Sequence, residues 1–221
     1  MNEFELIRDY FASQPVRRED VVLGIGDDAA LVSVPPEHEL VVASDMLVAG
    51  VHFPDATDAG SIGHKALAVN LSDLAAMGAE PAWFTLNLSL PQAERAWLGD
   101  FCTGLYGLAR RFQVALIGGD TARGPLTIGI QILGLVPRWQ ALTRSGAKPG
   151  DCIYVTGHLG EAALGLQLAQ GRLDLPEEYQ RPVLERLNRP LPRVAAGLQL
   201  RGVASACIDI SDGLVADLGH I

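Results

Sequence analysis

The sequence predicts an α/β (α+β) protein, in which an N-terminal sheet with helices on one face is followed by part of a second domain. Two patterns carry this prediction. Residues 83–90 alternate polar and apolar side chains, as expected of a strand with one apolar face. Residues 97–112 place large apolar side chains three or four positions apart, which is typical of an amphipathic helix that can cover such a face.

The other elements of the N-terminal part are predicted from the same periodicities and from turn-forming residues. We expect strands at residues 39–43, 114–117 and 126–136, and a helix at residues 61–78. The first of these strands is expected to end at Ser44 and Asp45, which would put a carboxylate at a strand end. On the expected helix, Asn70 and Asp73 are three residues apart and therefore share a face.

The pattern changes after Pro137, where turn-forming residues accumulate. We place a boundary there, which divides the chain into domains of residues 1–137 and 138–221. In the second domain we expect strands at residues 152–155 and 204–208, helices at residues 161–170 and 178–187, and the start of a helix at Leu214. These elements cannot complete a sheet, so we expect the second domain to be incomplete.

Composition and charge exclude several classes of protein. The chain has 221 residues, 48% of them hydrophobic, and it has no uncharged apolar run of about 18 residues that would span a membrane. Its net charge of −9 disfavours binding to nucleic acid, because the phosphate backbone attracts basic surfaces. Three isolated cysteines and an acidic N-terminus indicate a cytoplasmic protein without a disulfide framework or zinc site.

Aspartates recur beside small residues in five places, most of which follow expected strands. They are residues 24–28, 44–45, 70–73, 118–120 and 209–213. Magnesium prefers oxygen ligands, usually one or two carboxylates with water and substrate phosphates, and glycines let backbone amides approach an anion. Each site alone is also explained by the turn preferences of glycine and aspartate. Their number and their repeated position favour several magnesium ions in one pocket.

Two other ways of binding metal or ATP are not indicated. The sequence has no Asp-x-Asp-x-Asp-Gly calcium loop. Its only lysines are Lys65 and Lys148, and neither follows a glycine-rich phosphate loop; the motifs of protein kinases are absent as well. Phosphate must therefore be bound by metal ions, backbone amides and arginine.

Six motifs follow one another from end to end of the chain, at residues 24–30, 44–53, 65–78, 117–121, 142–147 and 208–213. In order and spacing they resemble the thiamine-monophosphate kinase family. The wider superfamily, which includes aminoimidazole ribonucleotide synthetase and selenophosphate synthetase, shares parts of the aspartate pattern. The segments at His52 and at residues 142–147 favour the thiamine enzyme. The resemblance implies a mixed N-terminal sheet that pairs with its twin in a homodimer, and a second α+β domain.

The resemblance also implies a reaction, in which ATP and thiamine monophosphate give ADP and thiamine diphosphate by in-line transfer. It implies that magnesium ions are bound by Asp28, Ser44, Asp45, Asp73, Asp120, Asp209 and Asp212, of which Asp120 and Asp212 are the predicted catalytic residues. It implies nucleotide contacts at Tyr106, Gly119, Asp120, Arg144 and Ser211, and contact of His52 with the thiamine phosphate. Asp27 is a weaker metal candidate.

Alternatives stay open for several of these assignments. Tyr106 equally fits a core position on its helix, Arg144 a surface position, and His52 a structural role after a strand. The whole chain could be another ATP-dependent enzyme of the superfamily, or a metal- and nucleotide-binding module that catalyses nothing. Family members also carry an acidic and an aromatic residue that hold the thiamine ring, and both would lie beyond Ile221.

Overall fold

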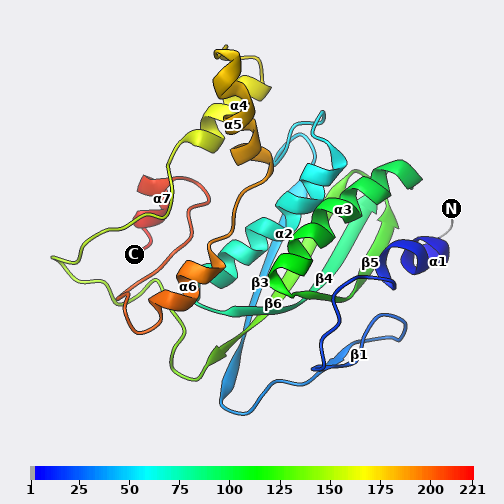
Figure 1. Cartoon of the computed structure of the whole chain (residues 1–221), viewed down its shortest axis with the longest axis horizontal. Helices are drawn as coiled ribbons and strands as arrows, with labels where there is room; N and C mark the ends of the chain where they lie inside the picture. The colour runs from blue at the N-terminus through cyan, green and yellow to red at the C-terminus, as the bar shows by residue number, and fades with distance from the viewer. Residues whose placement is uncertain (1–2) are drawn as a thin grey trace.

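A four-stranded mixed sheet forms the centre of the protein, whose computed structural model describes residues 3–221 (Figure 1). The strand order is β3 (His38–Val48), β6 (Thr127–Pro137), β4 (Glu80–Leu90) and β5 (Ala115–Arg123). β6 runs antiparallel to both of its neighbours, and β4 and β5 are parallel, so β3, β4 and β5 point in one direction. The predicted class, with a mixed N-terminal sheet, is confirmed.

Two long helices, α2 (Ala59–Ala76) and α3 (Arg95–Phe112), cover one face of this sheet. They lie side by side across it in Figure 1. A Cβ added at Gly104 would clash with the carbonyl oxygen of Gly60, so the helices touch through their backbones. We call the face under these helices the inner face and the opposite one the outer face. Because the inner face is covered by two helices in direct contact, it holds the main hydrophobic core.

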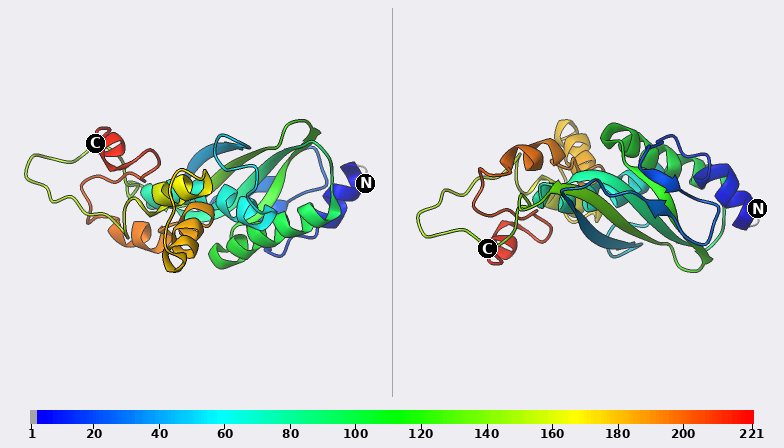
Figure 2. Two further views of the ribbon diagram at one scale, coloured as in Figure 1. Left: turned by 90° about the horizontal axis from the view of Figure 1, so that it is seen from above. Right: turned by 90° about the horizontal axis from the view of Figure 1, so that it is seen from below.

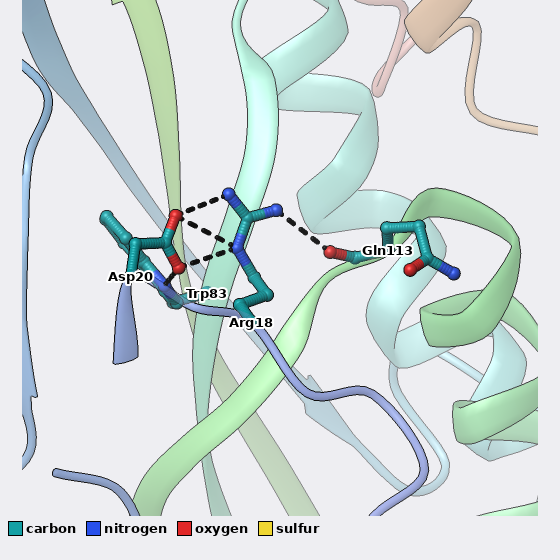
Figure 3. Close-up of polar contacts among 4 residues, drawn as sticks. All are labelled: Arg18, Asp20, Trp83 and Gln113. Atoms are coloured by element: carbon teal, nitrogen blue, oxygen red, sulfur yellow. Dashed lines mark hydrogen bonds and ion pairs between the residues drawn. The ribbon is translucent and has the colours of Figure 1, made fainter. Parts of the chain in front are cut away.

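The N-terminal segment contains α1 (Glu3–Leu6), a π-helix (Ile7–Phe11) and the small hairpin of β1 (Val21–Leu23) and β2 (Leu31–Val32). The π-helix packs against α3, and the residues just before β1 contact Trp83 of β4. Arg18 donates hydrogen bonds to the carboxylate of Asp20 and to the carbonyl oxygen of Gln113, and the indole of Trp83 donates to Asp20 at 3.0 Å (Figure 3). These contacts hold the segment against β4.

The described residues after Pro137 contain helices and no strand. The helices are α4 (Glu161–Ala169), α5 (Glu177–Asn188), α6 (Val194–Leu200) and α7 (Leu214–Leu218). α6 lies directly on α2, since a Cβ added at Gly197 would clash with the carbonyl oxygen of Ala75. Figure 2 shows α1 and α7 at opposite ends of an elongated molecule. Within residues 3–221, no helix has the length and apolarity needed to cross a membrane. The domain boundary at Pro137 stays a prediction.

Most expected elements form, but four differences bear on the site. β3 continues through Asp45 to Val48, and β5 continues through Gly119 to Arg123, because their partner strands keep pairing with them. The strands expected at residues 152–155 and 204–208 do not form, because no strand among residues 3–221 pairs with them. The β1–β2 hairpin and α6 were not predicted, since such short elements show little periodicity.

Candidate active site

The contact between β3 and α2 places Asp45 beside Asp73. Asn70 is only 1% exposed, and its side-chain oxygen accepts a hydrogen bond from the backbone N–H of Asp45 at 3.1 Å. The amide nitrogen of Asn70 donates to the carbonyl oxygen of Ala66 at 2.9 Å, which fixes the orientation of the side chain. Asp73 follows Asn70 by about one helical turn, so the same face of α2 carries it toward β3. Asn70 and Asp73 thus share a face of α2, as predicted, and this face lies against β3 at Asp45.

A segment from the other end of the chain brings Asp209 to the same place. The backbone N–H of Cys207 donates to the carbonyl oxygen of Thr143 at 2.9 Å. Gly146 has a φ of +134° and lies so close to Ser205 that a Cβ there would clash with its carbonyl oxygen. The chain segments around residues 143–146 and 205–209 therefore lie side by side. This pairing carries Arg144 and Asp209 toward α2.

The charges of these side chains act on one another. Burial raises the pKa of Asp73 to about 7, the negative charges of Asp45 and Asp209 add to this rise, and Arg144 opposes it. Burial and the charge of Asp209 also raise the pKa of Asp45, while His52 lowers it. Three partly buried carboxylates thus meet with too little positive charge to balance them. We call Asp45, Asp73 and Asp209 the inner cluster.

The inner cluster fits a divalent cation by its charge and its donor atoms. Carboxylate oxygens are the ligands that magnesium prefers, and an ion would offset both the burial of the Asp73 carboxylate and the repulsion from Asp45 and Asp209, which together hold its pKa near 7. Within residues 3–221, no group of three or more His, Cys, Asp or Glu side chains is already arranged at one point as metal ligands. The three carboxylates of the inner cluster interact electrostatically, and they would have to move closer together to hold one ion.

His52 lies next to the inner cluster in the loop after β3. Its Nδ1 accepts a hydrogen bond from the backbone N–H of Val48 at 3.0 Å, so the neutral ring carries its proton on Nε2. The ammonium group of Lys65 donates to the carbonyl oxygen of His52 at 2.9 Å, and burial lowers the pKa of this lysine. In the sequence, Lys65 was considered as the lysine of a phosphate-binding loop, and no such loop precedes it. In the structure it fixes the loop that carries His52.

Asp212 and Ser211 lie in the exposed turn that follows Asp209. The hydroxyl of Ser211 donates to the carboxylate of Asp209 at 3.4 Å. The turn leads into α7, and its backbone N–H groups donate to Asp217, a residue that the sequence did not single out. Its spacing, five residues after Asp212, gave no signal, because only the folded turn brings its carboxylate back under the amides.

Other predicted ligands lie on the outer face. Strand register aligns Asp45 with Ile130 and Leu86, both buried on the inner face, so its neighbours Ser44 and Met46 point outward. The next row of the sheet contains Met46, Gly129, Asn87 and Asp120. Asp120 is therefore on the outer face and, across three strand spacings, about 14 Å from β3. Its carboxylate accepts the N–H of Thr121 at 2.8 Å.

Gly119 and Asp28 also lie away from the inner cluster. Gly119 has a φ of +144°, and a Cβ there would clash with the carbonyl oxygen of Leu86, so glycine is needed for close pairing of β5 with β4. Asp28 is exposed in the loop between β1 and β2, where its N–H donates to Asp27 at 2.8 Å. One copy of the chain thus brings Asp45, Asp73, Asp209, His52 and Arg144 together, and leaves Asp28, Ser44 and Asp120 apart from them.

Tyr106 occupies a buried position on α3. Its hydroxyl donates to the carbonyl oxygen of Tyr10 at 2.7 Å, and burial raises its pKa. This contact accounts for the side chain as a link between α3 and the N-terminal segment. A nucleotide contact at Tyr106 stays a prediction.

A cavity of about 380 Å³ adjoins the inner cluster. It lies between α2, α4, α6 and the segment that carries Asp209, and Ser72, Thr156 and Arg193 are among its polar lining residues. This volume is in the range of sites that bind small molecules. Asp209 is the member of the inner cluster that lines the cavity, which therefore offers room for part of a substrate beside this carboxylate.

The chain is similar to a known protein family over most of its length. The family model described as "AIR synthase related protein, N-terminal domain" matches residues 26–136. The thiamine-monophosphate kinase of Escherichia coli (strain K12) is 52% identical over 220 residues, which make up 99% of this chain and 68% of that protein.

Two solved structures of this family share the fold, at 53% and 32% identity. The crystal structure of thiamine-monophosphate kinase from Stenotrophomonas maltophilia K279a has a TM-score of 0.86 and 53% identity, and the match covers 92% of this chain and 66% of that one. The structure described as AaThiL complexed with AMPPCP and TMP has a TM-score of 0.79 and 32% identity, covering 89% and 63% respectively. The chain thus spans about two thirds of the length of these relatives.

Proposed function

Because the chain belongs to the thiamine-monophosphate kinase family of AIR synthase related proteins, we propose that it acts in the ATP-dependent phosphorylation of thiamine monophosphate. One observation supports this above the others. Three carboxylates from distant segments meet with unbalanced charge, and the pKa of Asp73 is raised to about 7, in a chain that is 52% identical to such a kinase. The complex of AaThiL with AMPPCP and TMP supports ATP and thiamine monophosphate as the two ligands.

In the proposed reaction, an oxygen of the thiamine phosphate attacks the γ-phosphorus of ATP. The bond from that phosphorus to the β–γ bridging oxygen breaks, and ADP leaves with this oxygen. The attacking group is already an anion, so no strong general base is needed. The task of the protein is to hold two anionic groups in line and to offset their repulsion.

We assign the cation-binding part of this task to the inner cluster with Asp212. Asp45, Asp73 and Asp209 would hold magnesium through carboxylate oxygens, and Asp212 follows in the same turn as Asp209. Bound magnesium supplies positive charge that bridges and neutralises phosphate oxygens. Arg144, whose charge already acts on Asp73, is placed to contact a phosphate that approaches the cluster.

We assign the thiamine phosphate to the side of the cluster where His52 lies. With Nδ1 occupied by the N–H of Val48, the Nε2–H of His52 is the group that donates to a phosphate oxygen. The bond from Lys65 to the carbonyl oxygen of His52 holds this loop in place. Ser211, in the turn after Asp209, would contact the nucleotide. Contacts of Gly119, Asp120 and Tyr106 with the nucleotide stay predictions.

We propose that the chain forms a homodimer through the outer face. The outward side chains of β3 are exposed and apolar: Leu40 is 42% exposed, Val42 51% and Met46 62%. A row of exposed apolar side chains on an edge strand favours association with another surface. A second copy packed there would also cover Ser44 and Asp120, which lie on the same face.

The three free cysteines are compatible with action in the reducing cytoplasm.

One alternative is favoured by a specific observation. The chain spans 68% of the length of the Escherichia coli relative, so it would be a magnesium- and nucleotide-binding module if essential groups lie in the remaining third. An assay separates the two. Thiamine diphosphate formation would be measured for this chain alone and for the chain joined to the remaining third of that relative. Product from the chain alone supports the kinase. Magnesium-dependent binding of AMPPCP by the chain alone, with product from the joined protein only, supports the module, and no product from either protein counts against the kinase.

A further inference from the structure

Asp217 is the only buried residue of the Asp, Glu, Lys or Arg type among residues 5–221, with 5% of its surface exposed. One of its oxygens, Oδ2, accepts three hydrogen bonds from consecutive backbone N–H groups. The donors are Ser211 at 2.9 Å, Asp212 at 3.1 Å and Gly213 at 3.0 Å. The carboxylate thus fills the concave side of the turn between Asp209 and α7.

The carboxylate of Asp217 is held in its ionised form. Burial raises its pKa, but the three N–H donors lower the pKa by more, so the result lies below the ordinary range. Three hydrogen bonds to one anionic oxygen are stronger than three neutral ones. The backbone from Ser211 to Gly213 is therefore fixed by a charged group that belongs to the chain itself.

The hydrogen bonds to Asp217 decide whether the backbone amides of this turn are free to bind a phosphate. Glycine beside aspartate at residues 209–213 suggested that the backbone amides of this turn approach a phosphate. In the structure the amides of Ser211, Asp212 and Gly213 already donate to Asp217. These three amides are therefore not available to a phosphate, and the side chains that the turn offers to a ligand are the carboxylates of Asp209 and Asp212 and the hydroxyl of Ser211.

We propose that Asp217 is a positioning residue, whose carboxylate fixes the turn so that Asp209 and Asp212 face the cation site and Ser211 faces the nucleotide. Its role in the reaction rests on the proposed function. The inner cluster needs such support, because Asp209 repels Asp45 and Asp73 and would otherwise move away from them. An ion site built on a mobile turn binds weakly, and groups that orient metal ligands typically contribute 10–100-fold to affinity.

The test compares Asp217→Asn with Asp58→Asn. Asp58 is a matched control, because its carboxylate also accepts a backbone N–H, that of Ser61 at 2.8 Å, at the start of α2. Both variants should lower the Tm of the chain. The probe is magnesium alone, titrated calorimetrically into the nucleotide-free 221-residue chain. We expect Asp217→Asn to weaken magnesium binding by about tenfold or more, and Asp58→Asn to change it by less than about twofold.

A second readout follows the turn directly. Amide hydrogen exchange in the unliganded chain should be slow at Ser211, Asp212 and Gly213, and Asp217→Asn should accelerate it there. If Asp217→Asn does not fold, Asp217→Glu, which keeps the charge but moves it by one methylene, should fold and give an intermediate loss of magnesium affinity.

The outcomes separate the two proposals. Unchanged magnesium affinity in a folded Asp217 variant overturns the positioning role and leaves the proposed function standing. Equal losses in the Asp217 and Asp58 variants also overturn it, because the effect would then be one of general stability. A wild-type chain that binds neither magnesium nor AMPPCP overturns the proposed function, and with it any role of Asp217 in the reaction.

Discussion

The two faces of the sheet carry predicted ligands in different states. On the inner side, Asp45, Asp73 and Asp209 come from three distant segments, and burial together with their mutual repulsion raises the pKa values of Asp45 and Asp73. On the outer face, Ser44 and Asp120 lie on opposite edge strands, exposed and separated by two strands. Ser44 and Asp45 are adjacent in sequence, yet they belong to different groups because strand side chains alternate between faces.

The difference shows that a shared motif does not ensure a shared site. Distance along the chain is overcome by specific contacts, such as the hydrogen bond from Asp45 to Asn70 and the pairing of residue 143 with residue 207. The carboxylates that interact within one copy of the chain are those of the inner cluster, and we propose that they bind the cation. Ser44 and Asp120 would need a rearrangement of the chain to join them. The predictions below test this distinction, in order of decreasing effect.

The largest effect is expected for Asp73→Asn. The substitution removes the most strongly perturbed carboxylate of the inner cluster, so magnesium affinity should fall by about 100-fold. In the absence of magnesium the same change should raise the Tm at pH 8 by a few degrees, because a neutral amide avoids the burial of a charge and the repulsion from Asp45 and Asp209. Calorimetric titration and thermal melts measure the two effects. Loss of affinity together with a lower Tm would point to misfolding instead.

A pH-dependent effect should follow from the same side chain. The pKa of Asp73 is about 7 in the folded protein, against 3.8 for an unperturbed aspartate, so the folded state binds more protons between these pH values. Without metal, stability from this group should fall as the pH rises from about 4 to about 7. Saturating magnesium should therefore stabilise the chain more at pH 8 than at pH 5.5. Equal shifts of Tm at both pH values would contradict the electrostatic account.

A smaller effect is expected for Asn70→Ala. The side chain is buried and makes hydrogen bonds to both β3 and α2, so its loss should lower the free energy of unfolding by about 1–3 kcal/mol. Magnesium affinity should fall by about tenfold, because Asp45 is no longer held beside Asp73. Denaturant unfolding and titration measure these changes. Stability lost without any change in affinity would separate Asn70 from the site.

The outer face should behave differently. Val42→Asp places a charge among the exposed apolar side chains of β3, where Val42 is 51% exposed and so not needed for the core. We expect the variant to sediment as a monomer while its magnesium affinity stays within about twofold of wild type. A dimer that persists would move the interface elsewhere. A monomeric wild type would remove the dimer from the account.

The smallest effect on magnesium binding is expected for Asp120→Asn. Because Asp120 lies about 14 Å from β3 on the outer face, it should change the affinity of the inner cluster by less than about twofold. Turnover of the chain joined to the remaining third of its relative should nevertheless fall severely, if Asp120 acts on the nucleotide as predicted. A large loss of magnesium affinity in the chain alone would place Asp120 in the inner cluster.

The elements with strong periodicity and the residues with clear chemistry could be predicted from the sequence. The strand at residues 83–90 and the helix at residues 97–112 form as expected, because each buries one apolar face. The length of β3 was underestimated, since polar Ser44 and Asp45 look like the end of a strand whose pairing with β6 continues. The faces of Ser44 and Asp120 depend on that register. Asp217 depends on how the turn folds, which no spacing reveals.

The most direct test of two separate groups of ligands uses manganese in place of magnesium. The paramagnetic ion broadens NMR signals of nearby residues, and this effect falls steeply with distance. In the wild-type chain without nucleotide, substoichiometric manganese should broaden the signals of Asp45, Asp73 and Asp209 first and leave those of Asp28 and Asp120 sharp. Equal broadening of Asp120 and Asp73 at the lowest manganese concentration would contradict the division between the two faces.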